Sequence, residues 1–136
     1  MVIESNIKGP FGLVVTGEAE QLQPALDRII GPRWLRTYAV AGPGELLEVV
    51  GQGLADAAVL DSHSGWGLDV LQLLRTIRRL DSTLPVVILT VRQDRRWMES
   101  ALRLAAFSVV IKPLELEEML RQIYRMMARL DRMLRD

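Results

Sequence analysis

Three short apolar runs, each ending in a polar side chain, most constrain how this chain can fold. They cover residues 57–61, 85–90 and 107–112. Apolar runs of this length between turn residues are typical of strands buried on both faces of a parallel sheet. The carboxyl ends of such strands meet at one edge, so we expect Asp61, Thr90 and Lys112 to gather there. A carboxylate, a hydroxyl and an ammonium group at one edge are the components of a phosphoryl-binding pocket.

Segments with helical spacing of apolar residues alternate with the predicted strands along the whole chain. Strands are predicted over residues 11–15, 34–41, 57–61, 85–90 and 107–112. Helices are predicted over residues 22–30, 45–54, 68–80, 97–105 and 115–136. Strands that alternate with amphipathic helices through short loops predict a parallel sheet with helices on both faces. The predicted fold class is therefore α/β, a (βα)5 doubly wound sheet of five parallel strands.

One domain is expected over residues 11–128, after a lead-in over residues 1–10 that ends in Gly9-Pro10. The last helix carries an apolar stripe at alternating spacings of three and four, formed by Leu116, Met119, Ile123, Met126, Leu130 and Met133. A helix that continues to Asp136 would be roughly 30 Å long, which exceeds what the sheet needs. We therefore expect residues 129–136 to extend beyond the sheet and to expose Leu130, Met133 and Leu134. Such an extension is either a dimerisation or signalling helix or a fraying end.

Composition excludes several classes of function. The chain has 17 basic and 17 acidic residues, so it has no net charge that would attract nucleic acid or an anionic membrane. It has no cysteine and a single histidine, His63, which excludes disulfides, thiolate metal sites and sites with several histidines. No apolar run has the length of a membrane span and no signal peptide is evident. A cytoplasmic location is expected.

The polar residues at the three strand ends carry a resemblance to a known family. Asp61, Thr90 and Lys112-Pro113, with spacings of 29 and 22 residues, resemble the receiver domain of bacterial two-component response regulators. The resemblance covers residues 11 to about 128 and implies the flavodoxin-like receiver fold and a signalling domain, not an enzyme. It implies that Asp61 accepts a phosphoryl group from a histidine kinase, that Thr90 donates a hydrogen bond to that group and that Lys112 neutralises it. It also implies a cis Lys112-Pro113 bond.

The metal site of the family differs in this sequence. Thr16 and Gly17 stand where the family has two acidic residues that hold Mg²⁺, a hard cation that prefers carboxylate oxygens. Glu18 is the nearest acid, so the candidate metal ligands are Glu18, Asp61 and the backbone carbonyl of His63. We expect an impaired Mg²⁺ site. Arg92 is either a second counter-charge for Asp61 or a solvated loop residue.

These departures favour an atypical receiver that acts through protein contacts. Val109 stands where the family has a switching aromatic residue, and the loop after Asp61 lacks the family's proline. The expected partners are a histidine kinase or another signalling protein, and a second copy of the chain. The second copy is expected to bind through helices 97–105 and 115–136 or through the C-terminal helix. No contact with nucleic acid or membrane is expected. Two alternatives remain: a flavodoxin-like domain that binds a nucleotide or cofactor, although no glycine-rich phosphate loop is present, and a purely structural dimerisation module.

Overall fold

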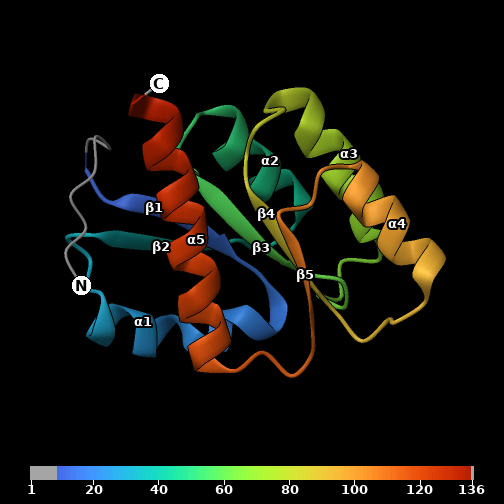
Figure 1. Ribbon diagram of the computed structural model, residues 1–136, viewed down its shortest axis with the longest axis horizontal. Helices are drawn as coiled ribbons and strands as arrows, with labels where there is room; N and C mark the ends of the chain where they lie inside the picture. The colour runs from blue at the N-terminus through green and yellow to red at the C-terminus, as the bar shows by residue number, and fades with distance from the viewer. Residues whose placement is uncertain (1–8, 136) are drawn as a thin grey trace.

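A computed structural model describes residues 9–135, and this part of the chain folds into one parallel sheet flanked by helices (Figure 1). The strands are β1 Phe11–Val15, β2 Leu35–Ala39, β3 Ala57–Asp61, β4 Val86–Thr90 and β5 Ser108–Ile111. The helices are α1 Gln23–Ile29, α2 Pro43–Gly51, α3 Val70–Leu80, α4 Arg95–Arg103 and α5 Leu116–Arg135, and a 3-10 helix, η1, covers Gly17–Leu22. The predicted alternation of strands and helices is confirmed.

The strands pair in parallel in the order β2-β1-β3-β4-β5, which places β3 at the centre of the sheet. The register aligns Asp61 with Leu89 on β4, which is one residue before Thr90. It aligns Thr90 with Ile111 on β5, which is one residue before Lys112. The polar ends of β3, β4 and β5 therefore lie at the same edge of the sheet. The (βα)5 doubly wound architecture predicted from the sequence is confirmed.

The sheet separates two apolar layers because successive side chains of a strand point to opposite faces. On one face, Ala58 and Leu60 of β3 pack with residues from α2, α3 and α4. On the other, Ala57 and Val59 pack with residues from α1 and α5. All five residues of β3 are buried, as are those of β1 and β4. Strands β1, β3 and β4 are therefore buried on both faces and hold the end of β3 in place.

The segment after β1 differs from the prediction. The chain turns at Gly17, whose φ of +55° is a conformation that favours glycine, and continues as η1 before α1 begins. Pro24 lies in the first turn of α1, where its missing N–H costs no helical hydrogen bond. The Lys112-Pro113 bond is cis, as the family resemblance implied. The early turn at Gly17 brings the next residue, Glu18, against the end of β3.

Helix α5 continues to Arg135 and lies across one face of the sheet (Figure 1). The predicted exposure of Leu130 is wrong, because this side chain is half-buried and packs against the core beneath α5. The helix therefore still covers the body of the domain at a point where an overhang was expected. The side chains of Met133 and Leu134, and residues 1–8 of the predicted lead-in, lie outside the described part of the chain.

Within residues 9–135, none of the helices combines the length and the apolar character that crossing a lipid bilayer requires.

Candidate functional site

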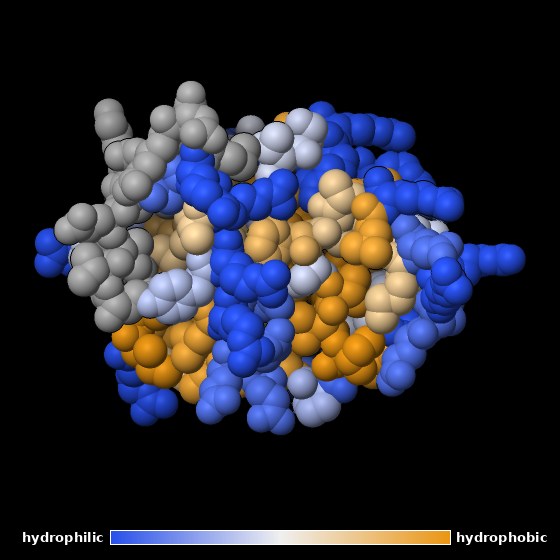
Figure 2. Space-filling view, in the orientation of Figure 1, coloured by the Kyte–Doolittle hydropathy of each residue, from blue (hydrophilic) through white to orange (hydrophobic). Residues whose placement is uncertain are grey.

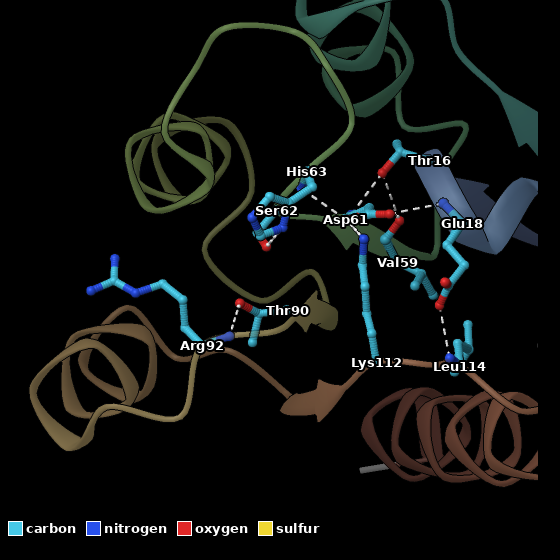
Figure 3. A network of polar contacts seen from close by, with 10 residues as sticks. All are labelled: Thr16, Glu18, Val59, Asp61, Ser62, His63, Thr90, Arg92, Lys112 and Leu114. Carbon is cyan, nitrogen blue, oxygen red and sulfur yellow. Dashed lines mark hydrogen bonds and ion pairs between the residues drawn. The ribbon is translucent and has the colours of Figure 1, made fainter.

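Asp61 is the centre of a polar network at the carboxyl edge of the sheet (Figure 3). Its side chain is buried, and its Oδ1 atom lies 2.6 Å from Lys112 Nζ. The N–H of His63 donates to the same oxygen at 2.8 Å, and the N–H of Glu18 donates to Oδ2 at 2.8 Å. The structure thus confirms that Asp61 and Lys112 meet, and it adds two backbone donors to the pair.

These donors determine the charge state of Asp61. Burial alone would raise the pKa of this carboxyl group. The N–H groups of Glu18 and His63 and the ammonium of Lys112 together outweigh burial, and they hold the pKa of Asp61 below its ordinary value of 3.8. The group is therefore an anion at neutral pH, as a nucleophile toward a phosphoryl donor must be.

Thr90 lies at the end of β4, next to β3, and is fully buried. Its Oγ1 accepts a hydrogen bond of 3.0 Å from the N–H of Arg92. The Arg92 guanidinium extends away from Asp61 in Figure 3 and pairs with Asp94, with 2.9 Å between Nε and Oδ1. The alternative that Arg92 neutralises Asp61 is therefore wrong in this structure, because its charge is already matched by Asp94 in an exposed loop.

Thr16 and Gly17 fill the space beside Asp61 at the end of β1. Thr16 is buried, and its Oγ1 accepts from the N–H of Asp61 at 2.9 Å and donates to the carbonyl of Val59 at 3.3 Å. A Cβ atom at Gly17 would lie 2.7 Å from Asp61 Cγ, closer than side chains pack. With the backbone in this position, an aspartate at position 17 would collide with Asp61. The pocket lined by Thr16 and Gly17 therefore differs in shape from one lined by two acidic residues at these positions.

Glu18 takes part in the site through both its backbone and its side chain. Its N–H binds Asp61, as described above, while its side chain turns toward the loop after β5 (Figure 3). There Glu18 Oε2 accepts a hydrogen bond of 2.8 Å from the N–H of Leu114, a residue two positions after Lys112. The carboxylate of Glu18 therefore faces a backbone donor and not the carboxylate of Asp61.

The residues beside Asp61 differ from the acidic set that the resemblance implied for Mg²⁺. Mg²⁺ requires octahedral oxygen coordination that usually includes one or two carboxylates. In the described chain, no three His, Cys, Asp or Glu side chains are grouped so that they could hold a metal ion. Both oxygens of Asp61 face N–H or ammonium donors. The ligand roles of Glu18, Asp61 and the His63 carbonyl stay predictions, and the position of the Glu18 side chain argues against its role.

Sequence reasoning missed the hydrogen bond between Thr16 and Asp61 and the donor roles of the Glu18, His63 and Leu114 N–H groups. Thr16 was identified only as the replacement of an acid, although a hydroxyl at the end of the adjacent strand could have indicated a contact with β3. The tie between Glu18 and Leu114 spans 96 positions and involves a backbone donor. No side-chain pattern in the sequence signals such a contact.

The comparisons with known proteins identify a family. The family model described as the response regulator receiver domain matches residues 13–124. The chain is 31% identical over 96 residues to the DNA-binding transcriptional regulator NtrC of Escherichia coli K12, covering 63% of this chain and 20% of that protein. It is 40% identical over 57 residues to the uncharacterized transcriptional regulatory protein YkoG of Bacillus subtilis 168, covering 42% and 25% respectively. The chain thus spans only about a fifth to a quarter of these curated relatives.

Solved structures agree on the fold. The receiver domain of TorR, the response regulator of the TMAO respiratory system, superposes with a TM-score of 0.73 at 25% identity, covering 90% of this chain and all of that one. A two-component response regulator from Clostridium difficile gives a TM-score of 0.73 at 18% identity, covering 89% and 98%.

Proposed function

Given that this chain belongs to the response regulator receiver domain family of two-component signalling, we propose that it acts mainly through protein contacts. Asp61 is the candidate phosphoacceptor, and Mg²⁺-assisted phosphoryl transfer to it is impaired. Thr90 and Lys112 are the residues that would bind the phosphoryl group. The domain has no catalytic turnover of its own. The alternative of a nucleotide- or cofactor-binding domain is not favoured by the family match.

One observation carries the proposal: the Asp61 carboxylate is enclosed by Lys112 and two backbone N–H groups, while the Glu18 carboxylate is turned to the N–H of Leu114. Receiver domains typically bind Mg²⁺ at their phosphorylation site, where the ion neutralises charge that develops on the transferring group. Here the ammonium of Lys112 is the cation nearest the acceptor oxygen. A single ammonium group neutralises less of the charge on the transferring group than an ammonium group and a divalent ion do together. This arrangement therefore supports slow or absent phosphorylation.

An apolar surface over β5 and between α4 and α5 supports the proposed protein contacts. Leu102 of α4 is 62% exposed, and Ile111 at the end of β5 and Tyr124 of α5 are also exposed. Figure 2 shows apolar surface in this region, beside a polar stripe that follows α5. Exposed apolar surface rimmed by polar residues is typical of interaction sites. We propose that a second copy of the chain binds here.

The remaining partners follow from the same family membership and charge balance. We propose that a histidine kinase or another signalling protein contacts the Asp61 edge of the sheet, and that the domain acts in the cytoplasm. Both curated relatives are transcriptional regulators by name, but with zero net charge this domain is proposed to make no contact with nucleic acid itself. In that case any output depends on a contact with another protein or domain.

The test is incubation with a small-molecule phosphoryl donor, with Mg²⁺ or with EDTA, followed by intact-mass analysis. We expect little or no phosphoryl adduct on the wild type in either condition, and none on Asp61→Ala. A receiver domain known to be phosphorylated, treated with the same donor, controls for donor activity. A stoichiometric, Mg²⁺-dependent adduct on the wild type alone would establish a conventional receiver and would overturn the impaired metal site.

The same samples test the protein contacts by sedimentation equilibrium. We expect a dimer whose dissociation constant is the same with and without the donor. In Leu102→Glu we expect this constant to rise at least about tenfold, because a charge would be desolvated in the contact. Leu54→Glu is the matched control, since Leu54 is also exposed but follows α2. A monomeric wild type, or equal effects of the two substitutions, would contradict the proposed surface.

A further inference from the structure

Glu18 joins two loops that are far apart in the sequence, and the site lies between them. The first loop follows β1 and supplies the N–H that binds Asp61 Oδ2. The second follows β5, carries Lys112, and supplies the N–H of Leu114 that binds Glu18 Oε2. Both hydrogen bonds are 2.8 Å long, and both involve the same residue. Glu18 therefore fixes the position of each loop relative to the other.

The hydrogen bond to Leu114 satisfies a backbone group that has little access to water. Leu114 is 8% exposed and Glu18 is half-buried. A buried N–H without an acceptor costs free energy comparable to a lost hydrogen bond, so the loop would shift to find another partner if Glu18 were shortened. Lys112 lies two residues earlier in that loop, and its ammonium is 2.6 Å from Asp61 Oδ1. A shift of the loop would displace this ammonium.

We propose that Glu18 is a positioning residue that closes the site around Asp61 without a divalent cation. Its N–H holds one oxygen of Asp61, and its carboxylate holds the loop from which Lys112 reaches the other oxygen. The inference rests on the proposed function, in which the Mg²⁺ site of this pocket is impaired. It identifies Glu18 as the residue that keeps the two loops together. Glu18, the acid nearest in sequence to the family's metal ligands, is thus assigned a role that uses hydrogen bonds in place of metal coordination.

The test compares Glu18→Gln with Glu18→Ala in EDTA, so that no divalent cation contributes. Both substitutions remove the charge, but only Ala removes the acceptor for Leu114. NMR measures the hydrogen exchange of the Leu114 amide. We expect this exchange to be about tenfold faster in Glu18→Ala than in the wild type, which corresponds to one lost hydrogen bond. In Glu18→Gln we expect the rate to stay within about threefold of the wild type. Glu18→Asp, which is one methylene shorter, is expected to resemble Ala and replaces it if the Ala variant does not fold.

The ammonium signal of Lys112 is a second readout, one that a purely structural role of Glu18 would not move. This signal is observable when an ion pair protects the ammonium protons from exchange with water. We expect it in the wild type and in Glu18→Gln, and we expect it to broaden beyond detection in Glu18→Ala. Equal Leu114 exchange in all variants, or an unchanged Lys112 signal in Glu18→Ala, would overturn the positioning role.

These measurements use neither a phosphoryl donor nor a partner protein, so they separate the two proposals. If the Leu114 and Lys112 signals respond as expected but the wild type forms a Mg²⁺-dependent adduct, the proposed function fails and Glu18 keeps its positioning role. If no adduct forms and the two signals do not respond, the proposed function stands and the role of Glu18 fails.

Discussion

Two aspartates at opposite ends of β3 have opposite electrostatic environments. Asp56 precedes the strand, and its Oδ2 accepts one hydrogen bond of 2.7 Å from the N–H of Gly12. Burial outweighs this single donor and raises the pKa of Asp56 above 3.8. Asp61 ends the same strand, and there two N–H groups and the Lys112 ammonium outweigh burial and lower the pKa. The number and charge of the donors, and not burial alone, decide which aspartate is held as an anion.

The comparison also concerns the neighbouring strand, because each aspartate lies beside a glycine of the β1 region. Gly12 gives its N–H to Asp56, and Gly17 allows the chain to pass close to Asp61. One end of β3 is thus joined to β1 through two uncharged backbone donors, the N–H of Gly12 to Asp56 Oδ2 and the N–H of Asp56 to the Gly12 carbonyl. The other end is joined to both β1 and β5 through charged and neutral donors. Only the second arrangement places a cationic group beside an aspartate.

The largest expected effect comes from removing the cation at the Asp61 end. Lys112→Met leaves a buried carboxylate with backbone donors only, and we expect a loss of about 3 kcal/mol in the free energy of unfolding at pH 7. Urea denaturation measures this loss. In an Asp61→Asn background the same substitution should cost less than about 1 kcal/mol, because no buried anion remains. Equal costs in the two backgrounds would show that Lys112 stabilises the fold through packing and not through Asp61.

The exposed ion pairs provide a control for this prediction. Arg95 and Glu99 pair on α4 with 3.1 Å between Nε and Oε1, and the Arg95 side chain is 92% exposed. Exposed pairs contribute about 0–1 kcal/mol, so Arg95→Met is expected to change stability by less than about 0.5 kcal/mol. A cost as large as that of Lys112→Met would mean that the buried position of Asp61 is not the cause of the difference.

The second effect concerns the close approach of the backbone at Gly17. Gly17→Ala is expected to cost about 2 kcal/mol, because the residue has a positive φ and its new methyl group would meet Asp61. Gly53→Ala is the matched control: Gly53 also has a positive φ, +72°, but its Cβ would meet nothing within 4 Å. Urea denaturation of both variants isolates the contact with Asp61 as the difference. Equal costs would indicate that conformation alone accounts for the effect.

How far the sequence predicts this molecule depends on the range of each interaction. The order of strands and helices follows from local apolar patterns, and the meeting of Asp61 with Lys112 follows from the parallel sheet that those patterns imply. The bond between Glu18 and Leu114 depends on the path of two loops, and it is made by a backbone group that every residue except proline has. The packing of Leu130 was missed because the periodic stripe of α5 does not reveal where the sheet beneath it ends.

A smaller effect than those of Lys112→Met and Gly17→Ala is expected at the opposite end of β3. Asp56→Asn keeps an oxygen that can accept from Gly12 but removes a carboxyl group whose charged form is disfavoured by burial. We therefore expect Asp56→Asn to leave stability at pH 7 unchanged or to raise it by up to about 1 kcal/mol. Asp61→Asn should lower it, because Lys112 loses its counter-charge. A loss of stability in both variants would remove the contrast between the two ends of β3.

The dependence of stability on pH should separate the two aspartates further. The folded pKa of Asp56 is raised, so its favourable contribution is present below 3.8 and is lost as the pH rises through the folded pKa. The folded pKa of Asp61 is lowered, so its contribution is present above 3.8 and is lost as the pH falls through the folded pKa. Urea titrations from pH 7 to pH 2 should therefore show the advantage of Asp56→Asn disappearing as the pH approaches 3.8 from above. The cost of Asp61→Asn should decline only below 3.8, and the reverse order would mean that the donors around Asp61 do not stabilise its anion.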